Sequence, residues 1–118
     1  MDRREVWETY ASAWKAEAVE DKRALFERAL DPAAIYTDPL MQTRSWGELE
    51  GYMVQFHQQV PGGHFVTTWF HAHHDRSIAR WDMRGADGGK LGEGISYGRY
   101  APDGRLLEMT GFFETPGA

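Results

Sequence analysis

Residues 64–86 read HFVTTWFHAHHDRSIARWDMRGA, and this stretch decides the fold. Apolar and polar residues alternate along 64–74 and again along 77–86, and Asp75-Arg76 between the two runs is a turn-forming pair. Alternation with a period of two is typical of a half-buried strand, and a short turn joins consecutive strands in antiparallel order. The stretch therefore predicts a β-hairpin.

Two further strand-like runs follow this hairpin, at residues 90–100 and 105–114. Asp87-Gly88-Gly89 precedes the first run and Pro102-Asp103-Gly104 precedes the second, and both tripeptides are rich in turn-forming residues. The second half of the chain therefore predicts an antiparallel meander of four strands.

The first half of the chain predicts three helices. Trp7, Tyr10 and Trp14 recur at spacings of three and four, as on the apolar face of an amphipathic helix. A second, short helix is expected from about Asp21 as its N-cap to Leu30, because Asp31-Pro32 stops it.

The third helix begins at a clearer signal. Ser45 followed three residues later by Glu48 forms a capping box, and Pro61-Gly62-Gly63 ends the helix. Its apolar face contains Leu49, Tyr52, Met53, Phe56 and Val60. Three helices followed by a curved antiparallel sheet predict a single α+β domain over residues 1–118, with the helices on one face and a hollow between the layers.

Composition narrows the possible functions. The chain has 118 residues, a formal net charge of −5 and no Cys, which excludes thiol chemistry and argues against nucleic acid or an anionic membrane as partner. Neither a targeting segment nor an apolar run long enough to span a membrane is evident, so we expect a soluble, cytoplasmic protein. Aromatic residues make up 14% of the chain, and in so small a domain they either fill the core or line a cavity.

Several motifs follow one another in a fixed order along the chain: Tyr10 and Trp14 on the first helix, Tyr36-x-Asp38-Pro39, Arg80-Trp81-x-Met83 and Asp103-Gly104-Arg105. This order resembles the nuclear transport factor 2-like superfamily, which includes SnoaL-like polyketide cyclases and ketosteroid isomerase. The resemblance extends over nearly the whole chain and implies a cone-shaped α+β barrel. Because this superfamily hosts many activities, the fold alone does not give the reaction.

Within the superfamily, the resemblance to ketosteroid isomerase implies three catalytic residues. Asp38 falls where that enzyme keeps its general base, and Tyr10 falls where it keeps a phenol that donates to the developing oxyanion. Ser96 stands where that enzyme has a protonated Asp as its second donor. In enzymes where it has been tested, loss of one oxyanion donor typically costs about 2.7–4 kcal/mol of transition-state stabilisation. The resemblance implies no cofactor.

Each of these residues also has an ordinary interpretation. An Asp before Pro is a common turn element whose carboxylate bonds nearby backbone N–H groups, which leaves Asp38 either structural or reactive. Tyr10 and Trp14 form an aromatic stripe at helical spacing, and such a stripe belongs to a core or to a pocket wall.

The pairing of the hairpin predicts which strand residues line the pocket. A two-residue turn at Asp75-Arg76 places Phe70 opposite Trp81, whereas a three-residue turn brings the opposite face of 64–74 inward. On the third strand, small residues around Ser96 either leave room for a ligand or allow the sheet to bend. The expected ligand-binding residues are Trp14, Tyr36, Phe56, Phe70, Trp81, Met83, Met109 and Phe113.

The other face of the sheet carries Trp69, Tyr97 and Phe112, and we expect it to form a homodimer. His71 and His73 share one strand face, but a catalytic zinc needs three protein ligands, so no metal is expected.

Taken together, the residues and the resemblance favour an enzyme that binds a small apolar molecule. The expected reaction is a cofactor-independent isomerisation or cyclisation in which Asp38 abstracts a proton next to a carbonyl and Tyr10 and Ser96 hold the enolate oxygen. The alternative is a non-catalytic ligand-binding or dimerisation module with the same fold.

Overall fold

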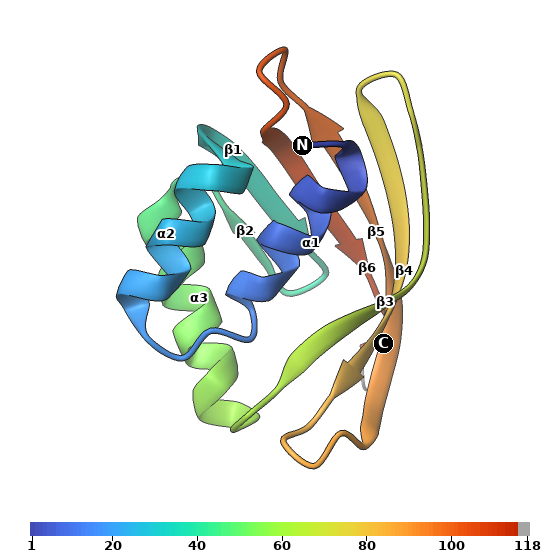
Figure 1. Cartoon of the computed structure of the whole chain (residues 1–118). Helices are drawn as coiled ribbons and strands as arrows, with labels where there is room; N and C mark the ends of the chain where they lie inside the picture. The colour runs from blue at the N-terminus through green and yellow to red at the C-terminus, as the bar shows by residue number, and fades with distance from the viewer. Residues whose placement is uncertain (116–118) are drawn as a thin grey trace.

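The computed structural model describes residues 1–115, so residues 116–118 of the predicted domain lie outside the described part. Its elements in chain order are α1 (Arg3–Ala13), α2 (Val19–Ala29), β1 (Leu30–Asp38), β2 (Met41–Thr43), α3 (Trp46–Gln59), β3 (His64–His73), β4 (Arg76–Arg84), β5 (Lys90–Tyr100) and β6 (Leu106–Phe112). The three helices pack on one face of the sheet, which confirms the predicted α+β class (Figure 1). None of the helices in residues 1–115 is long and apolar enough to cross a membrane.

Local capping explains where two of the helices begin. Asp2 accepts the backbone N–H of Glu5, and the Glu5 side chain accepts the backbone N–H of Asp2, which is a complete capping box. Ser45 caps α3 through the N–H of Glu48, as predicted, but the Glu48 carboxylate accepts from Arg44 instead of Ser45. The predicted N-cap of α2 was wrong, because α2 begins at Val19.

The sheet differs from the predicted antiparallel barrel in two respects. Its strand order is β2-β1-β6-β5-β4-β3, and β1 pairs with β6 in parallel, so the sheet is mixed. Its edge strands are β2 and β3, so it curves without closing (Figure 1). The sequence did not predict β1, whose alternating burial of Ala34, Tyr36 and Asp38 depends on β6 lying beside it.

A β-bulge divides β3 into two parts with opposite faces inward. The turn to β4 is formed by His74 and Asp75, with His74 at a φ of 52°, and Phe70 pairs with Ala79 instead of the predicted Trp81. This shift of two residues keeps Phe70 on the inner face, as predicted. Between Thr67 and Trp69 the register shifts by one residue, which turns Phe65 and Thr67 to the inner face as well.

The concave face of the sheet is filled along only half of its length. The half near the β3–β4 turn packs directly on the helices, and its inner face carries Ala79, Tyr100, Leu106 and Met109, all of them buried. The other half is where α3 leads into β3, and there the helices and the strands enclose a cavity.

Candidate functional site

The cavity has a volume of about 420 Å³ and lies between α1, α3 and the concave face of the sheet. Such a volume is in the range of small-molecule sites. Aromatic side chains form much of its wall, and they are Trp7, Tyr10, Trp14, Tyr36, Tyr52, Phe56, Phe65, Trp81 and Phe113.

Trp14, at the C-terminal end of α1, organises the aromatic wall. Its ring centroid lies 5.6 Å from Tyr36, 6.0 Å from Tyr52 and 5.4 Å from Phe65. The contacts with Tyr52 and Phe65 are edge-on, an arrangement that aromatic pairs prefer. Through this one indole, α1 is packed against β1, α3 and β3 at once.

Asp38, at the end of β1, is the one buried carboxylate of the cavity and accepts three hydrogen bonds. The hydroxyls of Tyr36 and Tyr52 donate to its Oδ2 at 2.6 and 2.8 Å, and the backbone N–H of Leu40 donates to Oδ1 at 2.8 Å. An ionised carboxylate has about four acceptor positions. Three of them are filled, so one position on Oδ1 remains for a ligand.

Two hydroxyls of the cavity wall each accept an indole N–H. Trp14 Nε1 donates to the Tyr10 hydroxyl at 3.0 Å, and Trp81 Nε1 donates to the Ser96 hydroxyl at 2.9 Å. Since an indole N–H can only donate, each hydroxyl oxygen acts as the acceptor and keeps its own proton for another partner. Tyr10 and Ser96 are therefore placed to donate to an acceptor atom in the cavity.

Gly111 on β6 brings Ser96 and Asp38 next to the same space. A Cβ atom at Gly111 would lie 3.5 Å from Ser96 Oγ and 3.8 Å from Asp38 Cβ. One small group of a ligand at this position would contact both side chains.

Burial raises the pKa values of the tyrosines around Asp38. Loss of solvent is the largest cause for Tyr10, Tyr36 and Tyr52, and the Asp38 carboxylate adds to the rise in each case. These phenols therefore stay protonated and remain hydrogen-bond donors at and well above neutral pH.

The structure places most of the predicted site residues on this cavity. Its wall includes Asp38, Tyr10, Ser96, Trp14, Tyr36, Phe56, Trp81, Met83 and Phe113. Phe70 and Met109 are not part of it, which corrects two of the expected ligand-binding residues. Both face inward, but they lie in the filled half of the sheet, where Met109 is buried in the core and Phe70 packs against it.

The sequence did not predict three aromatic wall residues, Trp7, Tyr52 and Phe65. Tyr52 was placed on the apolar face of the third helix, and its hydroxyl among aliphatic neighbours was the available signal for a polar contact in the interior. Nothing in the sequence marks the bulge after Thr67 that turns Phe65 inward.

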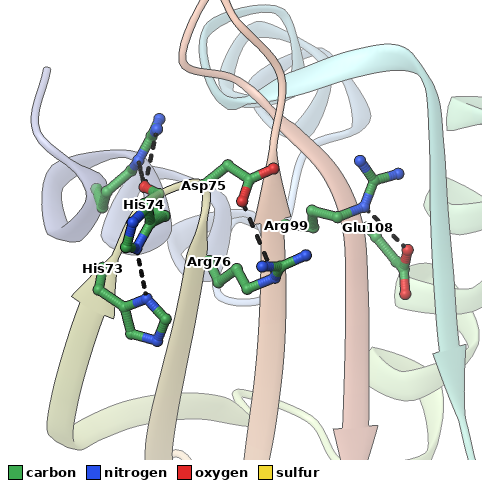
Figure 2. A network of polar contacts seen from close by, with 7 residues as sticks. His73, His74, Asp75, Arg76, Arg99 and Glu108 are labelled. Carbon is green, nitrogen blue, oxygen red and sulfur yellow. Dashed lines mark hydrogen bonds and ion pairs between the residues drawn. The ribbon is translucent and has the colours of Figure 1, made fainter.

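The histidines of the β3–β4 hairpin, His71, His73 and His74, lie apart from the cavity, at the turn and on the outer face of the sheet. The Nδ1 atoms of His73 and His74 lie 3.0 Å apart. These two residues lie beside the pairs Asp75–Arg76 and Arg99–Glu108 (Figure 2). Within residues 1–115, no three His, Cys, Asp or Glu side chains are grouped so that they could hold a metal ion.

The known proteins that match this chain are found among solved structures. No protein-family model and no curated protein matches the sequence. Among solved structures, a proposed isomerase of the SnoaL-like family from Agrobacterium tumefaciens is 25% identical, with a TM-score of 0.87 over 96% of this chain and 97% of that chain.

Two further similar structures have lower identity. A proposed SnoaL-like polyketide cyclase from Jannaschia sp. is 13% identical, with a TM-score of 0.76 over 95% of this chain and 85% of that chain. A SnoaL-like protein of unknown function from Burkholderia thailandensis is 15% identical, with a TM-score of 0.72 over 96% of this chain and 95% of that chain. These two likenesses concern the fold alone.

Proposed function

Because the chain belongs to the nuclear transport factor 2-like superfamily, we propose that it is an isomerase or cyclase that needs no cofactor and acts on an apolar cyclic ketone. One observation carries this proposal. A buried carboxylate with a free acceptor position, Asp38, shares an aromatic cavity with two hydroxyls whose protons are free to be donated, those of Tyr10 and Ser96.

Asp38 is the general base of the proposed reaction. Its three hydrogen bonds fix the plane of the carboxylate and direct the free position of Oδ1. The Oδ1 atom accepts the proton from the carbon next to the carbonyl group, and the bonding electrons of that C–H bond move into the enolate.

Tyr10 and Ser96 stabilise the enolate oxygen. Each hydroxyl donates one hydrogen bond, and the indole N–H behind it polarises the hydroxyl and strengthens the bond. Asp38 then returns the proton to a different carbon of the same enolate, so the double bond moves and the protein ends in its starting state. No oxidant, reductant or metal enters this balance.

A second candidate function is binding without catalysis. It is favoured by the three donors on Asp38, because a carboxylate whose partners all come from the protein is stable in a structural role. In that case the aromatic cavity holds a ligand, and Asp38 fixes Tyr36 and Tyr52 in its wall.

Proton exchange distinguishes the two functions. We expect the protein to isomerise 3-cyclohexenone to 2-cyclohexenone and to incorporate deuterium from D₂O, both measured by NMR. Asp38→Asn keeps the shape of the side chain but removes the base, and should slow the reaction about 10²–10⁴-fold.

Two controls accompany this experiment. Asp21→Asn makes the same chemical change at an exposed position of α2 and should leave the rate unchanged. Binding of 2-naphthol, a two-ring phenol that mimics an enolate, shows that the cavity of each variant is intact. Equal rates for wild type and Asp38→Asn, with 2-naphthol bound by both, would leave the binding function in place of the enzyme.

A further inference from the structure

We propose that the cavity selects its ligand by charge: it accepts an uncharged or cationic molecule and rejects an anionic one. The inference rests on the proposed function only in that a small molecule binds in the cavity. It does not depend on whether Asp38 acts as a base.

Apart from its tyrosines, the ionisable residues of the described cavity wall are Asp38, Glu93 and Glu114. Asp38 is buried inside, whereas Glu93 and Glu114 are exposed at the border of the wall. In the part of the chain that the structure describes, no Lys, Arg or His lines the cavity. A carboxylate, phosphate or sulfate group of a ligand would therefore find no cation to pair with.

Asp38 is not neutralised by a cation of the protein. Its donors are two phenols and a backbone N–H, and none of the ion pairs in residues 1–115 includes it. A second negative charge placed near a buried carboxylate is strongly unfavourable, because little water is present to screen the pair.

Glu93 and Glu114 do not carry their charge into the interior of the cavity. Glu93 lies between Gly92 and Gly94 on β5, whose partners Met83 and Trp81 line the cavity, so the Glu93 side chain faces the outer side of the sheet. Glu114 is exposed and lies beyond the end of β6. Asp38 is therefore the carboxylate that a ligand meets inside the cavity.

Glu93 is paired with a cation on that outer side. The Lys90 Nζ lies 3.4 Å from a carboxylate oxygen of Glu93 and 3.5 Å from a carboxylate oxygen of Asp82, so one lysine is shared by two carboxylates. Lys90 is not part of the cavity wall and does not pair with Asp38.

The aromatic wall favours the same ligands. The faces of aromatic rings are negative and attract cations, and Trp14, Phe65 and Trp81 line the cavity. The hydroxyls of Tyr10 and Ser96 serve the partial charge of a carbonyl or enolate oxygen. They do not supply the full positive charge that a separate carboxylate on the ligand would require.

A series of three ligands with the same two rings tests the inference. The ligands are 2-naphthol, its anionic derivative 6-hydroxy-2-naphthoate, and its cationic derivative 6-(aminomethyl)-2-naphthol, each titrated by calorimetry at pH 7. We expect the anion to bind at least about tenfold more weakly than 2-naphthol, and the cation at least as tightly as 2-naphthol.

A charge-removal variant shows where the selection arises. In Asp38→Asn, which removes the buried negative charge, binding of the anion should improve about three- to tenfold, and the preference for the cation should decrease. Glu27→Gln removes a negative charge from an exposed position of α2 and serves as the matched control, with no change in the order of the three ligands.

Anion binding equal to or tighter than that of 2-naphthol would overturn the inference, and so would a failure of both 2-naphthol and the cation to bind. The result is separate from that of the isomerisation assay, because titration needs no turnover. If the charge order holds while the wild type catalyses no exchange, the proposed enzyme fails and charge selection stands. If exchange occurs and the anion binds well, the enzyme stands and charge selection fails.

Discussion

At the scale of single residues, two glycines of the inner sheet face have different reasons for lacking a side chain. A Cβ atom on Gly94 would lie 2.6 Å from Cη2 of Trp81 and 2.7 Å from the carbonyl oxygen of Phe112, so packing requires glycine there. A Cβ atom on Gly111 would make ordinary contacts with Ser96 and Asp38. Packing does not require glycine at Gly111, and its effect is to leave space beside the carboxylate.

Gly111→Ala should therefore change binding without weakening the fold. The free energy of unfolding, measured by urea denaturation, should stay constant or rise by about 0.5–1 kcal/mol, because glycine is costly in a strand. The added methyl group should weaken 2-naphthol binding about tenfold or more by filling the space next to Asp38.

The matched variant Gly94→Ala should instead lower the free energy of unfolding. Its methyl group overlaps Trp81, and overpacking of this kind costs about 1–3 kcal/mol of stability. Unchanged 2-naphthol affinity in Gly111→Ala would mean that the ligand does not use the space between Ser96 and Asp38.

A site residue could be predicted where the position of its side chain follows from the helix or strand that carries it. Tyr10 and Trp14 follow from helical spacing, and the resemblance added Asp38 and Ser96, all of which line the cavity. The contact between Tyr52 and Asp38 was not predictable, because it joins α3 to β1 across 14 positions of sequence. Spacing within one helix carries no information about such a partner.

At the scale of elements, the hairpins and the third helix followed from local signals, and the pairing of β1 did not. Turn residues and alternation gave four strands close to their observed bounds, and Ser45 gave the start of α3. The parallel pairing of β1 with β6 joins the two halves of the chain, and the bulge in β3 changes the inward face in mid-strand. Both depend on long-range packing, which local sequence patterns do not record.

Three tyrosines connect the helical layer to the sheet, and they make the free energy of unfolding depend on pH in the alkaline range. Tyr10 of α1, Tyr36 of β1 and Tyr52 of α3 have raised pKa values because they are buried, and because they lie near Asp38. In the unfolded chain, tyrosine ionises near pH 10. Above that pH the unfolded state therefore binds fewer protons than the folded state, and the free energy of unfolding should fall.

Urea denaturation at pH 8, 10 and 11, followed by circular dichroism, measures this fall. Each phenol that ionises only on unfolding contributes a slope of about 1.4 kcal/mol per pH unit once the unfolded chain is ionised. Tyr36→Phe should reduce the slope by about one such contribution, and in the wild type the 295 nm absorbance of tyrosinate should appear together with unfolding. Ionisation of all the tyrosines near pH 10 in the folded protein would contradict this account.

At the scale of the whole molecule, a row of three apolar side chains and one arginine crosses the outer face of the sheet. The register places Trp69, Arg80, Ile95 and Phe112 side by side on four strands, and the Arg80 guanidinium lies 5.8 Å from the Trp69 ring. Phe112 is 62% exposed and Trp69 is 47% exposed, whereas the end of this face near the β3–β4 turn is polar (Figure 2). A face with an apolar centre and a polar border is typical of an interface.

We propose that this face joins two copies of the chain in a homodimer. Sedimentation equilibrium should give twice the 13.5 kDa of one chain, and Phe112→Glu should yield monomers because it buries a charge at the centre of the symmetric contact. Val19→Glu adds the same charge at an exposed apolar residue of α2 and should leave the dimer intact. Since the cavity opens on the concave side, the Phe112→Glu monomer should still bind 2-naphthol; a wild-type protein that sediments as a monomer would exclude this interface and leave the cavity proposals unaffected.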